Sequence, residues 1–334
     1  MINGKELVLS LTSTPKRLKN GYLKGVLEYL PKYERLDRVD KFYLCLDDNL
    51  KDGDRKAYED LVREIGEKSG IRFSILAGSA EWRSCNKLLP VYLENPDRYI
   101  LTIDDDARYP KGCFRQLFEV AEKEPDCIVC QEANPLVRTE KGCVFLNSID
   151  VMLRQKCWAS YLSNACLFPP NCFDEKYLTD LDDFKFIWNS SHDEKHFMVA
   201  SIMKGTQVVS LPYTYSYELD ANDEGNPVKY PEGPEALSVI NRGADVIGRM
   251  NDRLCAKYGD ALLAKTLEKP VIFELTPEQV QLFVWAMPYV KRLYQGFDVV
   301  VDVSRLTGSW RKVLAHTAAK LGFGMRFAET ENGK

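Results

Sequence analysis

The sequence predicts an α/β protein with a mostly parallel β-sheet flanked by helices, followed by a smaller C-terminal α/β segment. Over the first 130 residues, short apolar runs typical of buried strands alternate with longer amphipathic stretches typical of helices. The same alternation returns over residues 271–329. Strands that alternate with helices form parallel βαβ units, so helices are expected on both faces of the sheet.

The strands of the first half are apolar runs bounded by polar or turn-forming residues. They are expected at residues 6–11, 41–48, 71–78, 99–104 and 127–133. Helices are expected between them at 23–33, 52–70, 85–95 and 111–126. Gly70 favours the end of the second of these helices, because glycine accepts the left-handed conformation of a helix C-terminus. Residues 99–103, YILTI, show no alternation of polar side chains, which indicates a strand buried on both faces.

The second half begins with an irregular stretch over residues 150–235. It ends in YELDANDEGNPVKYPEGPE, whose proline, glycine, asparagine and acids are typical of a loop or a boundary. A helical stretch follows at 236–259, then strands at 271–275, 297–304 and 324–329, with helices at 276–294 and 309–321. We therefore predict one domain over residues 1–235 and a C-terminal helical and small βαβαβ segment of unknown role over 236–334.

Composition excludes several classes of protein. The 334 residues carry 45 Lys and Arg against 49 Asp and Glu, a net charge of −4, so no global basic field points to nucleic acid. No apolar run approaches the roughly 18 residues of a membrane span, and the first residues lack a secretory signal pattern. A soluble cytoplasmic protein is expected. Its ten cysteines are then expected to be reduced and mostly buried, the pair Cys127 and Cys130 included.

Three consecutive acids, Asp104, Asp105 and Asp106, follow the strand expected at 99–104. Adjacent carboxylates repel one another, so a cation is expected beside them. If the chain stays extended, Asp104 and Asp106 share one side and Asp105 points away. Oxygen ligands favour Mg²⁺ or Mn²⁺, and Mg²⁺ is usually held by one or two carboxylates together with substrate phosphates. We predict that Asp104 and Asp106 bind Mn²⁺ or Mg²⁺; the alternative is a solvated acidic turn before Pro110.

Three stretches together resemble a known family. They are LTSTPKR at residues 11–17, KLLP at 87–90 and TIDDDARYP at 102–110, with looser matches in CLFPP at 166–170 and HDE at 192–194. The sequence resembles the bacterial nucleotide-sugar-dependent glycosyltransferases of polysaccharide and lipopolysaccharide biosynthesis, which have the Rossmann-related GT-A fold and an Asp-X-Asp motif. The resemblance covers residues 5–212 and makes residues 1–235 a GT-A-like catalytic domain. The last hundred residues resemble no family named here.

The resemblance implies a metal-dependent transfer of a sugar, with inversion, from a nucleotide-diphosphate sugar to a glycan or glycolipid acceptor. Inversion needs a base on the acceptor hydroxyl. By resemblance this base is Asp193, with Glu194 as second choice; the alternative for Asp193 is a helix cap. The nucleotide and its phosphates would contact Thr12, Ser13, Arg17, Asp47, Lys87, Asp104 and Asp105. His196 is a candidate third metal ligand after Asp104 and Asp106.

Two other classes of protein fit the same acids. One is another metal-dependent nucleotide-processing enzyme, a phosphohydrolase or a nucleotidyltransferase. The other is a non-enzymatic glycan-binding protein that depends on a divalent ion, although such a protein does not need the phosphate-binding loop that LTSTPKRL suggests. Association with the inner face of the cytoplasmic membrane and a homo-oligomer both remain open, and no nucleic-acid partner is expected.

Overall fold

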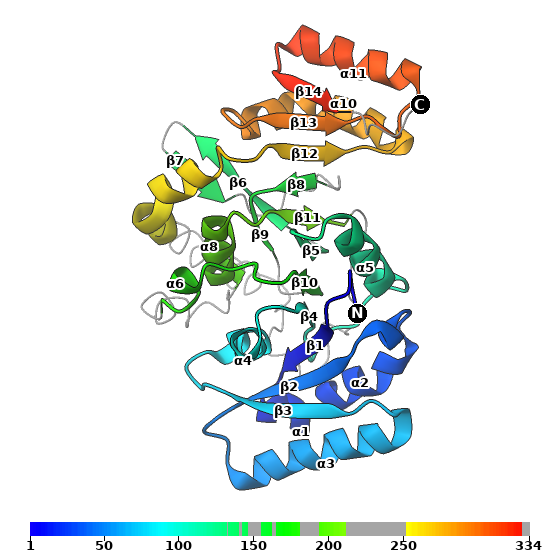
Figure 1. Cartoon of the computed structure of the whole chain (residues 1–334), viewed down its shortest axis with the longest axis vertical. Helices are drawn as coiled ribbons and strands as arrows, with labels where there is room; N and C mark the ends of the chain where they lie inside the picture. The colour runs from blue at the N-terminus through cyan, green and yellow to red at the C-terminus, as the bar shows by residue number, and fades with distance from the viewer. Residues whose placement is uncertain are drawn as a thin grey trace, which may run out of the picture.

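A computed structural model describes residues 1–131, 133–139, 142–145, 155–161, 165–180, 194–211 and 252–328. Through these residues runs a sheet of eleven strands in the order β14-β13-β12-β8-β11-β5-β10-β4-β1-β2-β3. The strands are β1 (Leu7–Thr12), β2 (Lys41–Asp47), β3 (Phe73–Gly78), β4 (Tyr99–Thr102), β5 (Ile128–Cys130), β8 (Gln155–Cys157), β10 (Cys166–Phe168), β11 (Val208–Ser210), β12 (Val271–Glu274), β13 (Val299–Asp302) and β14 (Met325–Ala328). Figure 1 shows the sheet extending from β3 at one end of the molecule to β14 at the other.

Most of these strands point in one direction. The four strands from β1 to β4 are parallel to one another, and so are the three from β12 to β14. The two short strands β8 and β10 run antiparallel to the strands beside them. The predicted α/β class with a mostly parallel sheet is therefore confirmed, and two reversed strands are inserted within it.

Helices cover both faces of the sheet (Figure 1). The labelled helices are α1 (Pro15–Lys19), α2 (Tyr22–Tyr29), α3 (Asp52–Ser69), α4 (Leu89–Glu94), α5 (Cys113–Lys123), α6 (Glu175–Leu178), α8 (Glu194–Lys204), α10 (Pro277–Leu293) and α11 (Gly308–Leu321). The apolar sides of α2, α3 and α5 pack on one face, against Leu9 and Leu101 among others. The apolar sides of α4, α8, α10 and α11 pack on the other face, where Val8 and Ile100 lie. No helix in the described residues is long and apolar enough to cross a membrane.

A second sheet of three strands lies beside the large one. Its order is β7-β6-β9, with β6 (Ala133–Thr139), β7 (Gly142–Phe145) and β9 (Ala159–Tyr161). A helix over residues 252–265 and α8 share a separate apolar cluster with it, which contains Leu136, Trp158 and Met198. The sequence did not predict this sheet.

Most of the predicted elements that fall on described residues are found, with changed bounds. Of the helix predicted at 236–259, only residues from 252 onward are described, and there the helix continues to residue 265. The strand expected at 99–104 ends at Thr102, so the acids follow it in a turn. The helix expected at 85–95 divides into a 3₁₀-helix, Arg83–Lys87, and α4, whose first turn contains Pro90. Proline fits there because the first turn needs no N–H donor. The C-terminal strands continue the large sheet through the pairing of β12 with β8. The boundary predicted at residue 235 lies outside the described residues and stays a prediction.

Candidate active site

The carboxyl ends of four parallel strands meet at one edge of the sheet. The register pairs Ser10 of β1 with Thr102 of β4, Thr12 with Cys45 of β2, and Asp47 with Gly78 of β3. The loops after these strands therefore emerge side by side. They carry Ser13, Arg17 and the three acids, and Lys87 lies at the end of the 3₁₀-helix that follows β3.

The three acids occupy a turn that two tyrosines hold. The backbone N–H of Asp104 donates to the hydroxyl of Tyr109 at 2.9 Å, and the N–H of Tyr109 donates to the hydroxyl of Tyr33 at 2.9 Å. Asp105 is 1% exposed, whereas the side chains of Asp104 and Asp106 are 20% and 28% exposed. The first and third acids thus reach the surface of the site, and the middle one is turned into the protein.

Arg17 is the charge partner of two of these acids. Thr14 caps α1, and Pro15 stands in its first turn, which fixes where the helix begins. The Arg17 guanidinium hydrogen-bonds Asp105 and forms an ion pair with Asp106 at 2.6 Å. Burial alone would lower the pKa of Arg17, but the charges of Asp105 and Asp106 outweigh it and raise that pKa. Arg17, predicted to contact phosphates, therefore already binds two carboxylates.

Lys87 compensates the remaining acid. Its Nζ lies 3.1 Å from Oδ1 of Asp104, and its side chain is almost fully buried. A buried ammonium group requires such a partner, because removing an unpaired charge from water costs several kcal/mol. Two cations and three carboxylates thus form one charged cluster, with a formal excess of one negative charge.

Asp47 belongs to a neighbouring polar group built around Asn86. The amide of Asn86 donates to Oδ1 of Asp47 at 2.7 Å and to the carbonyl of Ser79 at 2.8 Å, and its oxygen accepts from the N–H of Ser79 at 3.0 Å. Burial raises the pKa of Asp47, and the hydrogen bond from Asn86 opposes that rise. A Cβ on Gly78 would lie 2.0 Å from the Asn86 oxygen, so any larger residue here would displace Asn86. Sequence analysis missed Asn86, although it directly precedes Lys87.

Three buried oxygen atoms gather behind the acids. Oδ2 of Asp105, Oγ of Ser13 and the hydroxyl of Tyr58 are buried, and none has a well-formed hydrogen bond in the described part of the chain. Burial raises the pKa of Asp105, against the charge of Arg17, and burial also raises the pKa of Tyr58. The Ser13 hydroxyl opposes both of these rises through its interaction with Asp105 and Tyr58, so the three oxygens are polar neighbours of one another.

The carboxylate oxygens of the acid turn fit a hard divalent cation in part. Asp104 and Asp106 offer oxygen ligands from a single turn, as Mg²⁺ and Mn²⁺ prefer, and a diphosphate would supply further oxygens. Within the described residues, no group of three or more His, Cys, Asp or Glu side chains could hold a metal ion. A cation bound at this turn would replace Lys87 as the charge partner of Asp104 and Arg17 as the charge partner of Asp106.

The other predicted site residues are only partly placed. Thr12 ends β1, and its hydroxyl donates to the carbonyl of Cys45 at 2.8 Å. Glu194 is the first residue of α8, and His196 lies in the same helix, but their side chains fall outside the described part. Asp193 lies outside the described residues altogether. The acid turn, Arg17 and Lys87 are therefore brought together, while the predicted base and third metal ligand are not tested.

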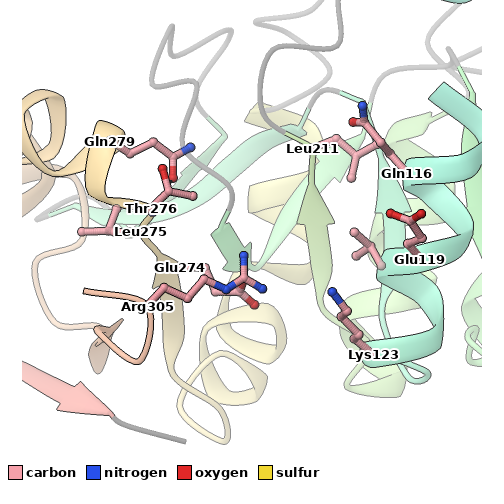
Figure 2. A pocket seen from close by; sticks show the side chains of 10 residues that line it. Gln116, Glu119, Lys123, Leu211, Glu274, Leu275, Thr276, Gln279 and Arg305 are labelled. Atoms are coloured by element: carbon pink, nitrogen blue, oxygen red, sulfur yellow. The ribbon is translucent and has the colours of Figure 1, made fainter. Parts of the chain in front are cut away.

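A cavity of about 250 Å³ lies apart from these residues, between α5 and the start of α10. Figure 2 shows Gln116, Glu119 and Lys123 on its α5 side and Thr276 and Gln279 on its α10 side. At its base, Arg305 lies 3.8 Å from Glu274. None of the predicted site residues whose side chains are described lines this cavity.

Comparison with known proteins leaves the family open. No protein-family model and no curated protein sequence matches the chain. Among solved structures, the chain is similar to the UTP-bound UGPase from Acinetobacter baumannii, with a TM-score of 0.37 and 10% identity over 72% of this chain and 98% of that one.

Proposed function

We propose that the chain is a metal-dependent glycosyltransferase of the GT-A kind. It would transfer a sugar from a nucleotide-diphosphate sugar to a glycan or glycolipid acceptor, with inversion, in the biosynthesis of a surface polysaccharide. The observation that carries the proposal is the charged cluster at the carboxyl ends of β1 and β4, where Asp104 and Asp106 are accessible beside Arg17 and Lys87. Open α/β sheets bind their ligands at this edge.

The cluster suits a diphosphate because it can exchange partners without leaving a charge unpaired. Arg17 and Lys87 are held beside the turn by Asp106 and Asp104. If a divalent cation occupied the two carboxylates, both side chains would be released toward the oxygens of the diphosphate. A bound Mn²⁺ or Mg²⁺ would stabilise the charge that develops on the leaving diphosphate. The buried Asp105 would keep Arg17 near the site throughout.

The neighbouring polar groups suit the nucleoside and the acceptor. Asp47, oriented by Asn86, would accept a hydrogen bond from a ribose hydroxyl or a base N–H. Thr12 and Ser13 follow at the end of β1, beside the buried oxygens. On the acceptor side, Asp193, or Glu194 in its place, would take the proton of the attacking hydroxyl. A lipid-linked acceptor would place the reaction at the inner face of the cytoplasmic membrane.

A thermal-shift panel of nucleoside diphosphates and nucleotide sugars, each with and without Mn²⁺, tests the donor site. A ligand that binds the native state raises the melting temperature. We expect a metal-dependent shift with one nucleotide, and we expect Asp104→Ala and Asp106→Ala to abolish it while each variant remains folded. A shift of wild-type size in either variant would refute the metal-site assignment.

Turnover assays separate the rival functions. Sugar transfer that requires an acceptor supports the glycosyltransferase. Product formed without a sugar acceptor, or transfer of a nucleoside monophosphate, indicates a phosphohydrolase or a nucleotidyltransferase. Glycan binding without nucleotide affinity indicates a binding protein. Asp193→Ala is expected to lose turnover and keep the donor-induced thermal shift; undiminished turnover would remove Asp193 as the base.

A further inference from the structure

Two cysteines that are far apart in the sequence have their sulfur atoms in contact. Cys143 lies in β7, and Cys255 lies 112 positions later in the helix over residues 252–265. Their Sγ atoms are 2.9 Å apart, and the thiol of Cys255 also donates to the carbonyl oxygen of Cys143 at 3.0 Å. Both are free thiols. The contact joins the three-stranded sheet to the helix.

This pair differs from the other cysteines of the chain. All ten cysteines lie in the described residues, and nine of them are buried, whereas Cys255 is partly exposed. The hydrogen bond between the two thiols lowers the pKa of Cys143, while burial raises the pKa of Cys127 to about 11. The thiolate is the reactive form of cysteine, so its lowered pKa makes Cys143 the better nucleophile. Cys255 has the more exposed side chain of the two.

The surrounding packing holds the two sulfur atoms together. The helix over 252–265 buries Leu254, Tyr258 and Leu262 in the apolar cluster that contains Leu136 of β6. A Cβ on Gly259 would lie 3.6 Å from Sγ of Cys143, so this sulfur sits against the helix one turn after Cys255. A disulfide has an S–S distance of about 2.05 Å. The sulfur atoms need to approach by less than about 1 Å, which side-chain rotation can supply.

We propose that Cys143 and Cys255 form an oxidation site, at which hydrogen peroxide converts the two thiols into an intramolecular disulfide. The Cys143 thiolate attacks a peroxide oxygen, so an S–O bond forms, the O–O bond breaks and water leaves after protonation. Cys255 then attacks the sulfenic acid, the S–S bond forms, and the S–O bond breaks with release of a second water. Two thiols thus lose two hydrogen atoms, and one hydrogen peroxide becomes two waters.

The test uses the reduced full chain, freed of reductant and treated with one equivalent of hydrogen peroxide. Free thiols counted under denaturing conditions should fall from ten to eight, and dithiothreitol should restore all ten. Peptide mapping without reduction should show Cys143 linked to Cys255. The melting temperature should rise on oxidation, because the bond closes a long loop in the unfolded chain. None of these readouts depends on the proposed transferase activity.

Matched variants distinguish this site from general thiol oxidation. Cys143→Ser and Cys255→Ser should each give no linked peptide and no rise in melting temperature. The control Cys127→Ser starts with nine thiols and should fall to seven with the same linked peptide. Retention of all ten thiols in the wild type would overturn the proposal. So would a link between a different pair, or the same rise in melting temperature in the two serine variants.

Discussion

At the scale of single residues, the three acids divide into different environments. Asp105 is buried against Arg17, whereas Asp104 and Asp106 are accessible. The alternation expected of an extended chain gives the same division, although the strand ends at Thr102 and a turn produces it instead. Asp105, predicted to contact the nucleotide, is placed where it can orient Arg17.

Asp105→Ala is expected to lower the free energy of unfolding by about 2–3 kcal/mol, because it leaves the Arg17 guanidinium half-buried with one carboxylate fewer. Asp106→Ala is the matched control. It removes a partly exposed acid and leaves Asp105 in place, so less than about 1 kcal/mol should be lost. Urea denaturation of both variants measures the difference. An equal loss in the two would show that Asp105 has no special structural role.

Gly78→Ala should disturb the nucleoside side of the site. The added Cβ would lie 2.0 Å from the Asn86 oxygen, so Asn86 must move and lose its bonds to Asp47 and Ser79. We expect a loss of about 1–3 kcal/mol in stability and a weaker nucleotide-induced thermal shift. Gly25→Ala in α2 is the control, because nothing lies within 4 Å of its Cβ position, and it should be neutral or stabilising. Normal nucleotide binding by Gly78→Ala would exclude the Asn86 group from the site.

Sequence reasoning located the acid turn and placed Arg17 and Lys87 in the same site, but it did not predict which acid each of them contacts. The acids could be predicted because an apolar run leads directly into them. Arg17 is 88 positions from Asp105, and the pair depends on β1 and β4 being neighbours in the sheet. Asn86 gave no signal, since a single asparagine before Lys87 is common in a polar turn. The contact between Cys143 and Cys255 likewise exists only in the folded chain.

At the scale of elements, the periodic helices and the strands of the βαβ units were predictable, whereas the two reversed strands were not. The helix α3 ends before Gly70, whose φ of 77° has the left-handed conformation that was expected there. The strands β8 and β10 have three residues each, too few to show a hydrophobic period. Each of them pairs antiparallel with the strands beside it. Their place in the sheet therefore cannot be derived from the alternation of strands and helices along the sequence.

The contact between α2 and α3 predicts a pH dependence. Glu64 of α3 accepts from Lys24 of α2 at 2.9 Å and from Lys68 at 2.5 Å, and these bonds lower the pKa of Glu64 to about 2. A lowered native pKa means that Glu64 stabilises the protein above its ordinary value near 4.5, and that this contribution disappears as the pH falls toward 2. The difference in melting temperature between wild type and Glu64→Gln should therefore narrow between pH 5 and 2.5. A constant difference over this range would contradict the assignment.

At the scale of the whole molecule, the C-terminal βαβαβ unit is continuous with the rest of the fold. It was predicted as a separate segment because a long irregular stretch precedes it. The structure joins β12 to β8, and the Tyr294 hydroxyl donates to Gln155 at 3.1 Å. One apolar cluster contains both Phe168 of β10 and Phe273 of β12. Sequence alternation identified the unit, but its attachment depends on a three-residue strand that the sequence does not reveal.

This continuity predicts cooperative unfolding of the described parts of the chain. Calorimetry of the full chain should show a single transition, in which the calorimetric and van't Hoff enthalpies agree. A chain truncated after Glu268 would expose β8 as an edge and remove Phe273 from the shared cluster. It should therefore lose the cooperative transition or aggregate. Two separate transitions in the full chain, together with a truncated chain that melts like the first of them, would instead support independent domains divided near residue 235.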